Sequence, residues 1–294
     1  MSNLNYAIKP VAQLRAEIEA AAKQWALAEG TVFVEADCDG VACEWIDVPH
    51  PIRSEREEDT AVYLHAHGGG YYRGSSRVDA AFCSHLCAEA DARCLSVNYR
   101  RPPDEGVFPA ALDDLYTVWR WIISPEGGGV SPQKIAVGGT SAGGGLCLAL
   151  LLKIRDEGGP LPAAAAVVSP WTDLTQSGES FVSNAAHGPD REYLSYWADV
   201  YLADADAKTP YASPLFASLH DLPPVLVQAG GQETMLDDAT AFAAAAARAG
   251  CSINLEVYAD QPHSFQHEAA ENEVAREAIT RLAHFVRRWV DARQ

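Results

Sequence analysis

Long apolar runs are scarce in this chain of 294 residues. The most apolar stretch, LCLALLL at 146–152, is far too short to span a bilayer and is typical of a buried helix. The first thirty residues mix charged residues with alanines and hold no apolar core of signal-peptide length. We therefore expect a soluble protein of the cytoplasm, with no membrane partner.

Basic residues are also few, because 22 Lys and Arg stand against 40 Asp and Glu and give a formal charge of −18. A chain this acidic repels phosphate backbones, which argues against a nucleic-acid partner. The seven cysteines form neither a CxxC pair nor a paired zinc-ligand pattern, so we expect buried free thiols and no metal.

Short runs rich in Val, Ile and Leu do occur, and helical stretches mostly separate them. The runs are AVYLHAH (61–67), CLSVNY (94–99), KIAVGG (134–139), AAAVVSP (164–170), PVLVQAG (224–230) and INLEVYA (253–259). This alternation predicts an α/β fold with a mostly parallel central sheet flanked by helices, and active loops at the carboxyl ends of its strands. Two earlier runs, at 31–37 and 42–49, alternate in a way that favours an antiparallel start. Before them, residues 15–30 are predicted as a helix that ends at Gly30.

One segment interrupts this rhythm, because no strand-like run lies between Asp173 and about Ala212. It contains a helix-like stretch in which Tyr193, Tyr196, Trp197 and Tyr201 share one face. Packing against the body of the protein and lining a substrate site both explain such a face.

The clearest chemical motif is G-x-S-x-G at 139–143, between an apolar strand and an apolar helix. A serine at such a tight turn is exposed at the helix N-terminus, which makes Ser141 the candidate nucleophile. A dinucleotide-binding loop is the competing interpretation, and it fails because no G-x-G-x-x-G register fits these glycines.

A serine hydroxyl needs a histidine base that a carboxylate orients. Of the downstream histidines, His263 lies in a short loop directly after the last strand-like run, whereas His267 and His284 are expected at the surface of the terminal helical region. Glu233 is the acidic residue nearest the end of the preceding strand and is the candidate acid. Its competitors, Asp237 and Asp238, are expected to begin a helix.

Acyl transfer places negative charge on the substrate oxygen, and amide donors must stabilise it. The glycines of HGGG at 67–70 follow a strand without side chains in the way, so we expect the N–H groups of Gly69, Gly70 and Ala142 to form the oxyanion hole. His67 is expected to fix this loop by hydrogen bonding rather than to act in catalysis.

Taken together, these motifs resemble the bacterial esterases related to hormone-sensitive lipase, within the α/β-hydrolase superfamily. The resemblance rests on HGGG (67–70), NYR with FPAALDD (98–114), GTSAGG (139–144), SPWTDL (169–174) and PHSF (262–265), in the family's order. Members commonly have Asp-Pro-Leu where this chain has Glu233-Thr234-Met235, and Gly-Asp-Ser where it has Gly-Thr-Ser, so it is similar to the GTSAGG branch.

The resemblance implies an α/β-hydrolase fold with a helical cap. The cap would comprise residues 1–45 and 174–212, and the catalytic core residues 46–173 and 213–294. It also implies a homodimer through the last strand and helix.

The expected activity is cofactor-free hydrolysis of short-chain carboxylic esters through an acyl-enzyme, with Ser141, His263 and Glu233 as the triad. Alternatives are a lactone hydrolase or an amidase with the same triad and, from another class, a non-catalytic ligand-binding protein on a hydrolase fold. The expected pocket aromatics are Tyr71, Tyr72, Tyr193 and Trp197.

Overall fold

The computed structural model describes residues 9–49 and 60–291. Its centre is an eight-stranded sheet of order β1-β2-β4-β3-β5-β6-β7-β8. Strand β2 pairs antiparallel with β1 and β4, and all other pairings are parallel. The strands are β1 Val32–Cys38, β2 Val41–Asp47, β3 Ala61–Ala66, β4 Ala92–Val97, β5 Ile135–Thr140, β6 Ala164–Val168, β7 Val225–Gly230 and β8 Ile253–Tyr258. The α/β fold expected from the sequence, including its antiparallel start, is confirmed.

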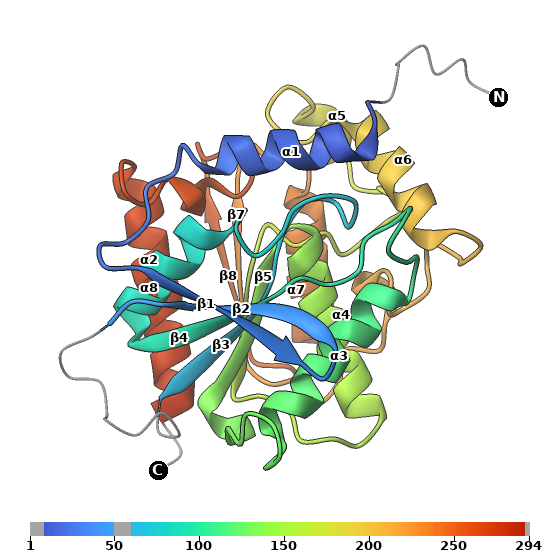
Figure 1. Cartoon of the computed structure of the whole chain (residues 1–294). Helices are drawn as coiled ribbons and strands as arrows, with labels where there is room; N and C mark the ends of the chain where they lie inside the picture. Colours follow the sequence, from blue (N-terminus) through green and yellow to red (C-terminus); the bar gives the residue numbers. More distant parts are fainter. Residues whose placement is uncertain (1–8, 50–59, 292–294) are drawn as a thin grey trace.

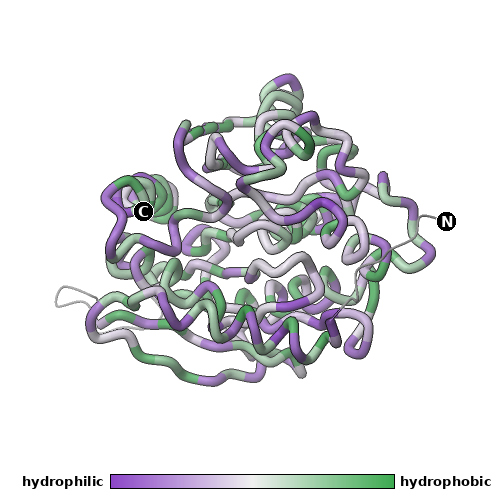
Figure 2. Tube along the Cα trace, turned by 90° about the horizontal axis from the view of Figure 1, so that it is seen from above, coloured by the Kyte–Doolittle hydropathy of each residue, from purple (hydrophilic) through white to green (hydrophobic). Residues whose placement is uncertain are grey.

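Helices cover both faces of this sheet (Figure 1). On one face lie α3 (Ala110–Ile123), α4 (Ala142–Asp156) and α7 (Leu236–Arg248), and on the other lie α2 (Ala80–Ala90) and α8 (Glu273–Asp291). Every residue of β3, β5, β6 and β7 is buried, as expected for parallel strands covered on both sides. Seen from above, the outer helices carry both hydrophobic and hydrophilic residues (Figure 2), since each buries one side only.

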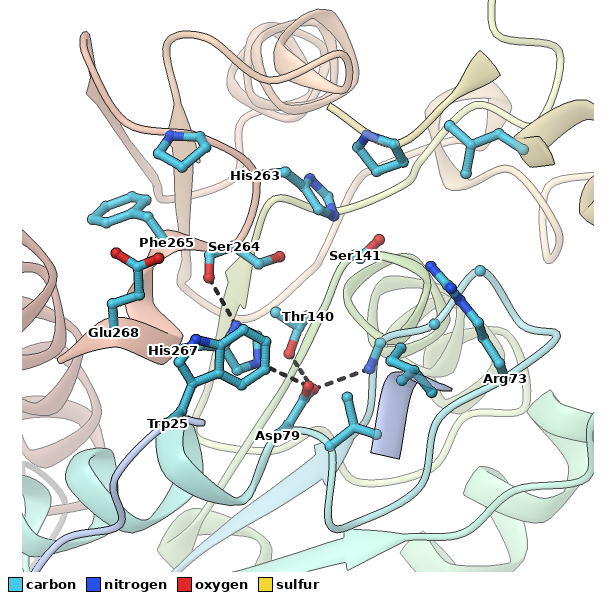
Figure 3. Close-up of a pocket in the computed structure, with 18 of the residues that line it drawn as sticks. Trp25, Arg73, Asp79, Thr140, Ser141, His263, Ser264, Phe265, His267 and Glu268 are labelled. Atoms are coloured by element: carbon cyan, nitrogen blue, oxygen red, sulfur yellow. Dashed lines mark hydrogen bonds and ion pairs between the residues drawn. The ribbon is translucent and has the colours of Figure 1, made fainter. Parts of the chain in front are cut away.

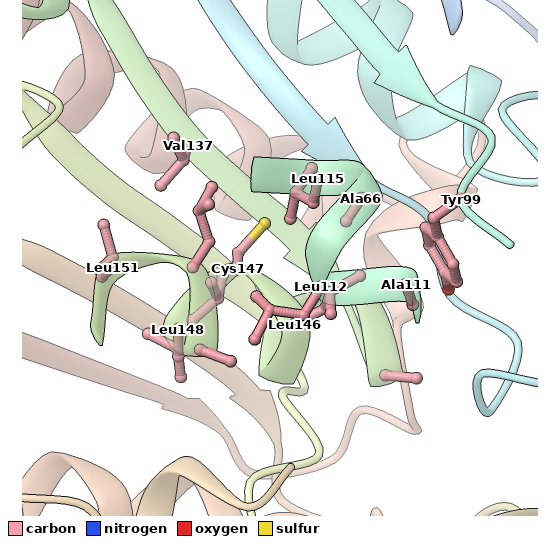
Figure 4. Close-up of a cluster of buried hydrophobic side chains, with 14 of the residues drawn as sticks. Ala66, Tyr99, Ala111, Leu112, Leu115, Val137, Leu146, Cys147, Leu148 and Leu151 are labelled. Atoms are coloured by element: carbon pink, nitrogen blue, oxygen red, sulfur yellow. The ribbon is translucent and has the colours of Figure 1, made fainter. Parts of the chain in front are cut away.

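The larger core cluster packs α3 and α4 against the sheet. Leu112 and Leu115 of α3 lie beside Leu146 of α4, with Val137 of β5 in the same cluster (Figure 4). Helix α4 is apolar nearly all round, so it is enclosed rather than half exposed. This packing fixes the end of β5 and the start of α4, the two elements on either side of Ser141.

The remaining helices, α1 (Val11–Ala22), α5 (Ser180–Ser183) and α6 (Arg191–Leu202), lie together over one end of the sheet (Figure 1). They fall within the segments 1–45 and 174–212 expected as the cap. However, β1 and β2 belong to the sheet, so residues 32–45 extend the core. Helix α1 is also shorter than predicted, because it ends at Ala22 and Gly30 lies in a turn before β1.

No helix among the described residues has both the length and the apolar composition that crossing a membrane requires.

Candidate active site

Ser141 occupies a sharp turn between β5 and α4. Its φ of 55° and ψ of −120° are a conformation that L residues rarely adopt. The N–H of Ser141 donates to Val168 O at 2.9 Å, and its carbonyl accepts from Trp171 N at 2.9 Å. A Cβ on Gly143 would lie 2.0 Å from Ala66 O, so only glycine lets the helix start this close to β3. The strained turn is therefore held by its neighbours and presents the serine hydroxyl to a cavity.

Glu233 and His263 come from the turns after β7 and β8, which are neighbouring strands of the sheet. The Nδ1–H of His263 donates to Oε2 of Glu233 at 2.7 Å, and the Glu233 side chain is fully buried. This contact orients the imidazole and leaves Nε2 to face the cavity that Ser141 also lines. The glutamate side chain is thus long enough to reach the histidine.

The Ser141 hydroxyl is weakly held. Its hydrogen-bond partner in the described part of the chain is the sulfur of Met235, at 3.9 Å. A thioether is a poor acceptor, so this contact leaves the hydroxyl free to rotate.

The loop of residues 67–74 directly follows β3, and it is called the oxyanion loop below because it contains Gly69 and Gly70, the expected oxyanion-hole donors. Gly69 and Gly70 have φ values of 119° and 67°, which glycine adopts without strain. A Cβ would lie 2.2 Å from Arg73 O at Gly69 and 2.4 Å from the Trp197 ring at Gly70. Neither glycine N–H donates a hydrogen bond within the described residues, and Ala142 is the first residue of α4. All three N–H groups are therefore available to an oxyanion.

Asp79 connects the loops around the site, and sequence reasoning did not single it out. Its Oδ2 accepts from the Gly68 N–H at 3.0 Å, from His65 Nε2 at 2.9 Å and from the Thr140 hydroxyl, and its Oδ1 accepts from His267 Nε2 at 2.9 Å. Burial raises the pKa of Asp79, but hydrogen bonds from His267 and His65 outweigh it and hold the pKa well below its usual range. One carboxylate thereby ties the oxyanion loop, the residue before Ser141 and the loop after His263 together.

His267 is not at the surface, so that expectation was wrong. Only 5% of it is exposed, its Nδ1 lies 2.8 Å from Ser264 O, and its ring stacks on Trp25 at 4.5 Å. A short 3₁₀ helix, Phe265–Glu268, turns His267 back under the histidine loop. Trp25 reaches it because α1 ends early. The position of His267, four residues after His263, was the sequence signal that could have placed it near the site.

His67 holds the oxyanion loop, as its place in HGGG suggested. It is fully buried, stacks on Tyr99 at 4.2 Å, and its Nδ1 lies 2.8 Å from Gly68 O. Burial lowers the pKa of His67 to about 4, so the ring is neutral at neutral pH.

Ser141 and His263 both line a cavity of about 190 Å³ (Figure 3). Ile18 of α1 and Leu194 and Trp197 of α6 supply apolar walls. Of the four aromatic residues expected at the pocket, Trp197 lines this cavity. The other three lie behind its wall: the rings of Tyr72 and Tyr193 pack 6.1 and 5.8 Å from that of Trp197, and Tyr71 stacks on Tyr201 at 4.0 Å.

The chain is similar to known proteins over most of its length. A family model described as the alpha/beta hydrolase fold matches residues 63–267. The crystal structure of an esterase from the bacterial hormone-sensitive lipase family is 38% identical, with a TM-score of 0.90 over 97% of this chain and 94% of that one. The chain belongs to this family. Membership of the hormone-sensitive lipase family places it among the carboxylic-ester hydrolases.

Further relatives carry related names. An acetyl-hydrolase of Streptomyces hygroscopicus is 37% identical over 236 residues, which are 80% of this chain and 74% of the relative. An esterase of Acinetobacter venetianus is 31% identical over 229 residues, which are 77% and 74% of the two chains. The structure of EstE5 soaked with p-nitrophenyl butyrate is 33% identical, with a TM-score of 0.89 over 99% of this chain and 95% of that one.

Proposed function

We propose that this member of the hormone-sensitive lipase family hydrolyses small carboxylic esters through an acyl-enzyme on Ser141. The observation that carries the proposal is the 2.7 Å contact between Glu233 and His263, next to a serine that occupies a strained turn and lines the same cavity. A carboxylate–histidine pair beside such a serine is the arrangement that nucleophilic acyl transfer needs.

In the first half-reaction, the Ser141 oxygen attacks the acyl carbon while Nε2 of His263 takes the hydroxyl proton. Glu233 stabilises the resulting imidazolium across its hydrogen bond. The carbonyl oxygen becomes negative and accepts hydrogen bonds from the N–H groups of Gly69, Gly70 and Ala142. The ester bond then breaks, and His263 returns its proton to the departing alkoxide.

In the second half-reaction, water attacks the acyl-enzyme and His263 takes its proton. The tetrahedral intermediate collapses, the Ser141 oxygen leaves with the proton from His263, and the carboxylic acid is released. Each step uses groups of this chain and water.

Short acyl chains suit the cavity. Its volume of about 190 Å³ is below the roughly 300 Å³ at which pockets for drug-sized ligands begin. Trp197 and Leu194 of α6 bound it, and an acyl chain that extends past them would have to displace the cap helix. Activity is therefore expected to fall steeply from butanoate to palmitate esters.

The test is kcat/KM for p-nitrophenyl butanoate with the wild type, Ser141→Ala and the exposed control Ser131→Ala. The account predicts a loss of about 10³-fold or more for Ser141→Ala and none for the control. Turnover of lactones without turnover of esters would instead identify a lactone hydrolase. A folded wild type that turns over neither esters nor lactones would point to a non-catalytic ligand-binding protein on a hydrolase fold.

The proposal includes a homodimer and a cytoplasmic location. Strand β8 is an edge of the sheet, and 38% of Leu255 and 45% of Val257 are exposed on it, which is the kind of edge that pairs with another strand. The seven cysteines are free, in keeping with a reducing compartment, and cell fractionation tests that location.

A further inference from the structure

Arg73 is the only Lys or Arg among the described residues that line the active-site cavity. It belongs to the oxyanion loop, because its N–H donates to Gly69 O at 3.1 Å. Its guanidinium lies 4.5 Å from the ring centre of Trp197, on the cap side of the cavity. Figure 3 shows it on the side of the cavity opposite His267 and Glu268. A positive charge therefore lies beside the residues that would react with the ester.

This cation lacks a carboxylate within the described part of the chain. No ion pair or hydrogen bond joins its guanidinium to a described residue, and its Nε is buried without a partner. The contrast with other arginines is clear, since Arg15, Arg100 and Arg101 each lie within 3.0 Å of a carboxylate oxygen. The chain has 40 acidic and 22 basic residues, so carboxylates are plentiful. An arginine without a carboxylate partner in the active site is therefore unexpected.

The acidic groups around Arg73 are already engaged. Glu17 of α1 attracts the guanidinium, but it is itself bound by Lys9 at 2.8 Å and Gln13 at 2.9 Å. Asp79 is saturated by its own hydrogen bonds, and Glu268 lies across the cavity with Asn272 at 3.3 Å. The cavity thus has a positive wall at Arg73 and a negative wall at Glu268.

We propose that Arg73 binds a carboxylate carried by the substrate, so that the preferred esters are anionic. This inference rests on the proposed ester hydrolysis and names its substrate class. A guanidinium presents two parallel N–H donors that match a carboxylate, and its partial removal from water strengthens the attraction. Trp197 holds the guanidinium in place by stacking, so little side-chain freedom is lost on binding.

The carboxylate can sit on the acyl side or on the alcohol side of the ester, and two substrate pairs distinguish these. The acyl-side pair is mono-4-nitrophenyl adipate against 4-nitrophenyl hexanoate. The alcohol-side pair is 4-acetoxybenzoate against its methyl ester. In each pair the readout is the ratio of kcat/KM for the anionic ester to kcat/KM for the neutral ester, so a general loss of activity cancels.

The wild type is expected to give a ratio of about 10 or more in one pair, which identifies the side, and Arg73→Met should lower that ratio at least about tenfold. Arg73→Lys keeps the charge and should retain part of the preference. Arg248→Met removes an exposed cation from α7 and should leave the ratio unchanged. Ratios in both pairs that agree within about twofold between the wild type and Arg73→Met would overturn the inference.

A binding measurement separates this inference from the proposed reaction. Adipate is titrated calorimetrically into Ser141→Ala and into Ser141→Ala with Arg73→Met, neither of which needs to turn over. At least about tenfold weaker binding to the double variant supports the carboxylate site even if ester hydrolysis fails. Equal affinities would overturn the site even if Ser141 proves to be the nucleophile.

Discussion

Two buried carboxylates, Glu233 and Asp79, each hold a histidine from the segment after β8, but their surroundings differ. Glu233 binds His263 through Oε2, and its Oε1 has no partner within the described residues. Both oxygens of Asp79 are occupied, and both ring nitrogens of His267 are hydrogen-bonded. By contrast, only Nδ1 of His263 is engaged by its carboxylate, and Nε2 faces the cavity. Of these two similar pairs, one is thus arranged to exchange a proton and the other to hold loops in place.

Changing each carboxylate to its amide should separate these roles most strongly. Glu233→Gln is expected to lower kcat by about 10³-fold or more with little change in stability, because a neutral amide cannot stabilise the imidazolium of His263. Steady-state kinetics with p-nitrophenyl butanoate and thermal unfolding measure the two effects.

Asp79→Asn should do the opposite. An amide cannot accept hydrogen bonds from four donors, so the free energy of unfolding should fall by about 3 kcal/mol. The remaining folded enzyme should keep far more of its kcat than Glu233→Gln does. A loss of kcat equal to that of Glu233→Gln, at unchanged stability, would show that the roles are assigned the wrong way round.

A third buried group, His67, should make stability depend on pH. Its folded pKa of about 4 lies below the ordinary value of 6.5, so between these values the unfolded chain binds a proton that the folded chain does not. Its contribution is therefore complete above pH 6.5 and is lost as the pH falls towards 4, by roughly 3 kcal/mol in all. Urea unfolding of the wild type and His67→Gln at several pH values measures it.

The control is His284→Gln, which changes an exposed histidine of α8. His284→Gln should lose as much stability as the wild type when the pH falls from 6.5 to 4. His67→Gln should lose about 3 kcal/mol less over the same range. If His67→Gln loses stability with falling pH as steeply as the wild type, His67 is not buried in its neutral form.

The smallest effect on catalysis is expected far from both carboxylates, at the exposed edge of β8. Val257→Lys places a charge on that edge and should convert a homodimer into monomers, because strand pairing there would bury the ammonium group. Light scattering after size exclusion measures the mass. Val34→Lys is the matched control on the opposite edge strand, β1, and should leave the mass unchanged. A wild type that is already monomeric would contradict the dimer.

Local sequence patterns were sufficient to predict the strands, the turn at Ser141 and the loop of His263. Each of these depends on residues adjacent in the chain: apolar runs, small residues at a tight turn, and a histidine directly after a strand. The order of the strands and the shortened α1 could not be obtained in this way, because packing between distant segments decides them.

The Asp79 network was missed for the same reason. Asp79 and His267 are 188 residues apart, and nothing next to either residue indicates that they meet. The unpaired state of Arg73 is also a property of the folded cavity. The walls of this cavity depend on how α1 and α6 pack over the sheet, which explains why Trp197 lines the cavity whereas Tyr71, Tyr72 and Tyr193 do not.

The most direct test of the central claim is the mass of the protein during turnover. Wild-type enzyme mixed with p-nitrophenyl butanoate is quenched in acid within milliseconds and analysed by intact and peptide mass spectrometry. The account predicts one added butanoyl group, located on Ser141 and absent from Ser141→Ala. Turnover that leaves Ser141 unmodified under these conditions, or an equal adduct on Ser141→Ala, would contradict it.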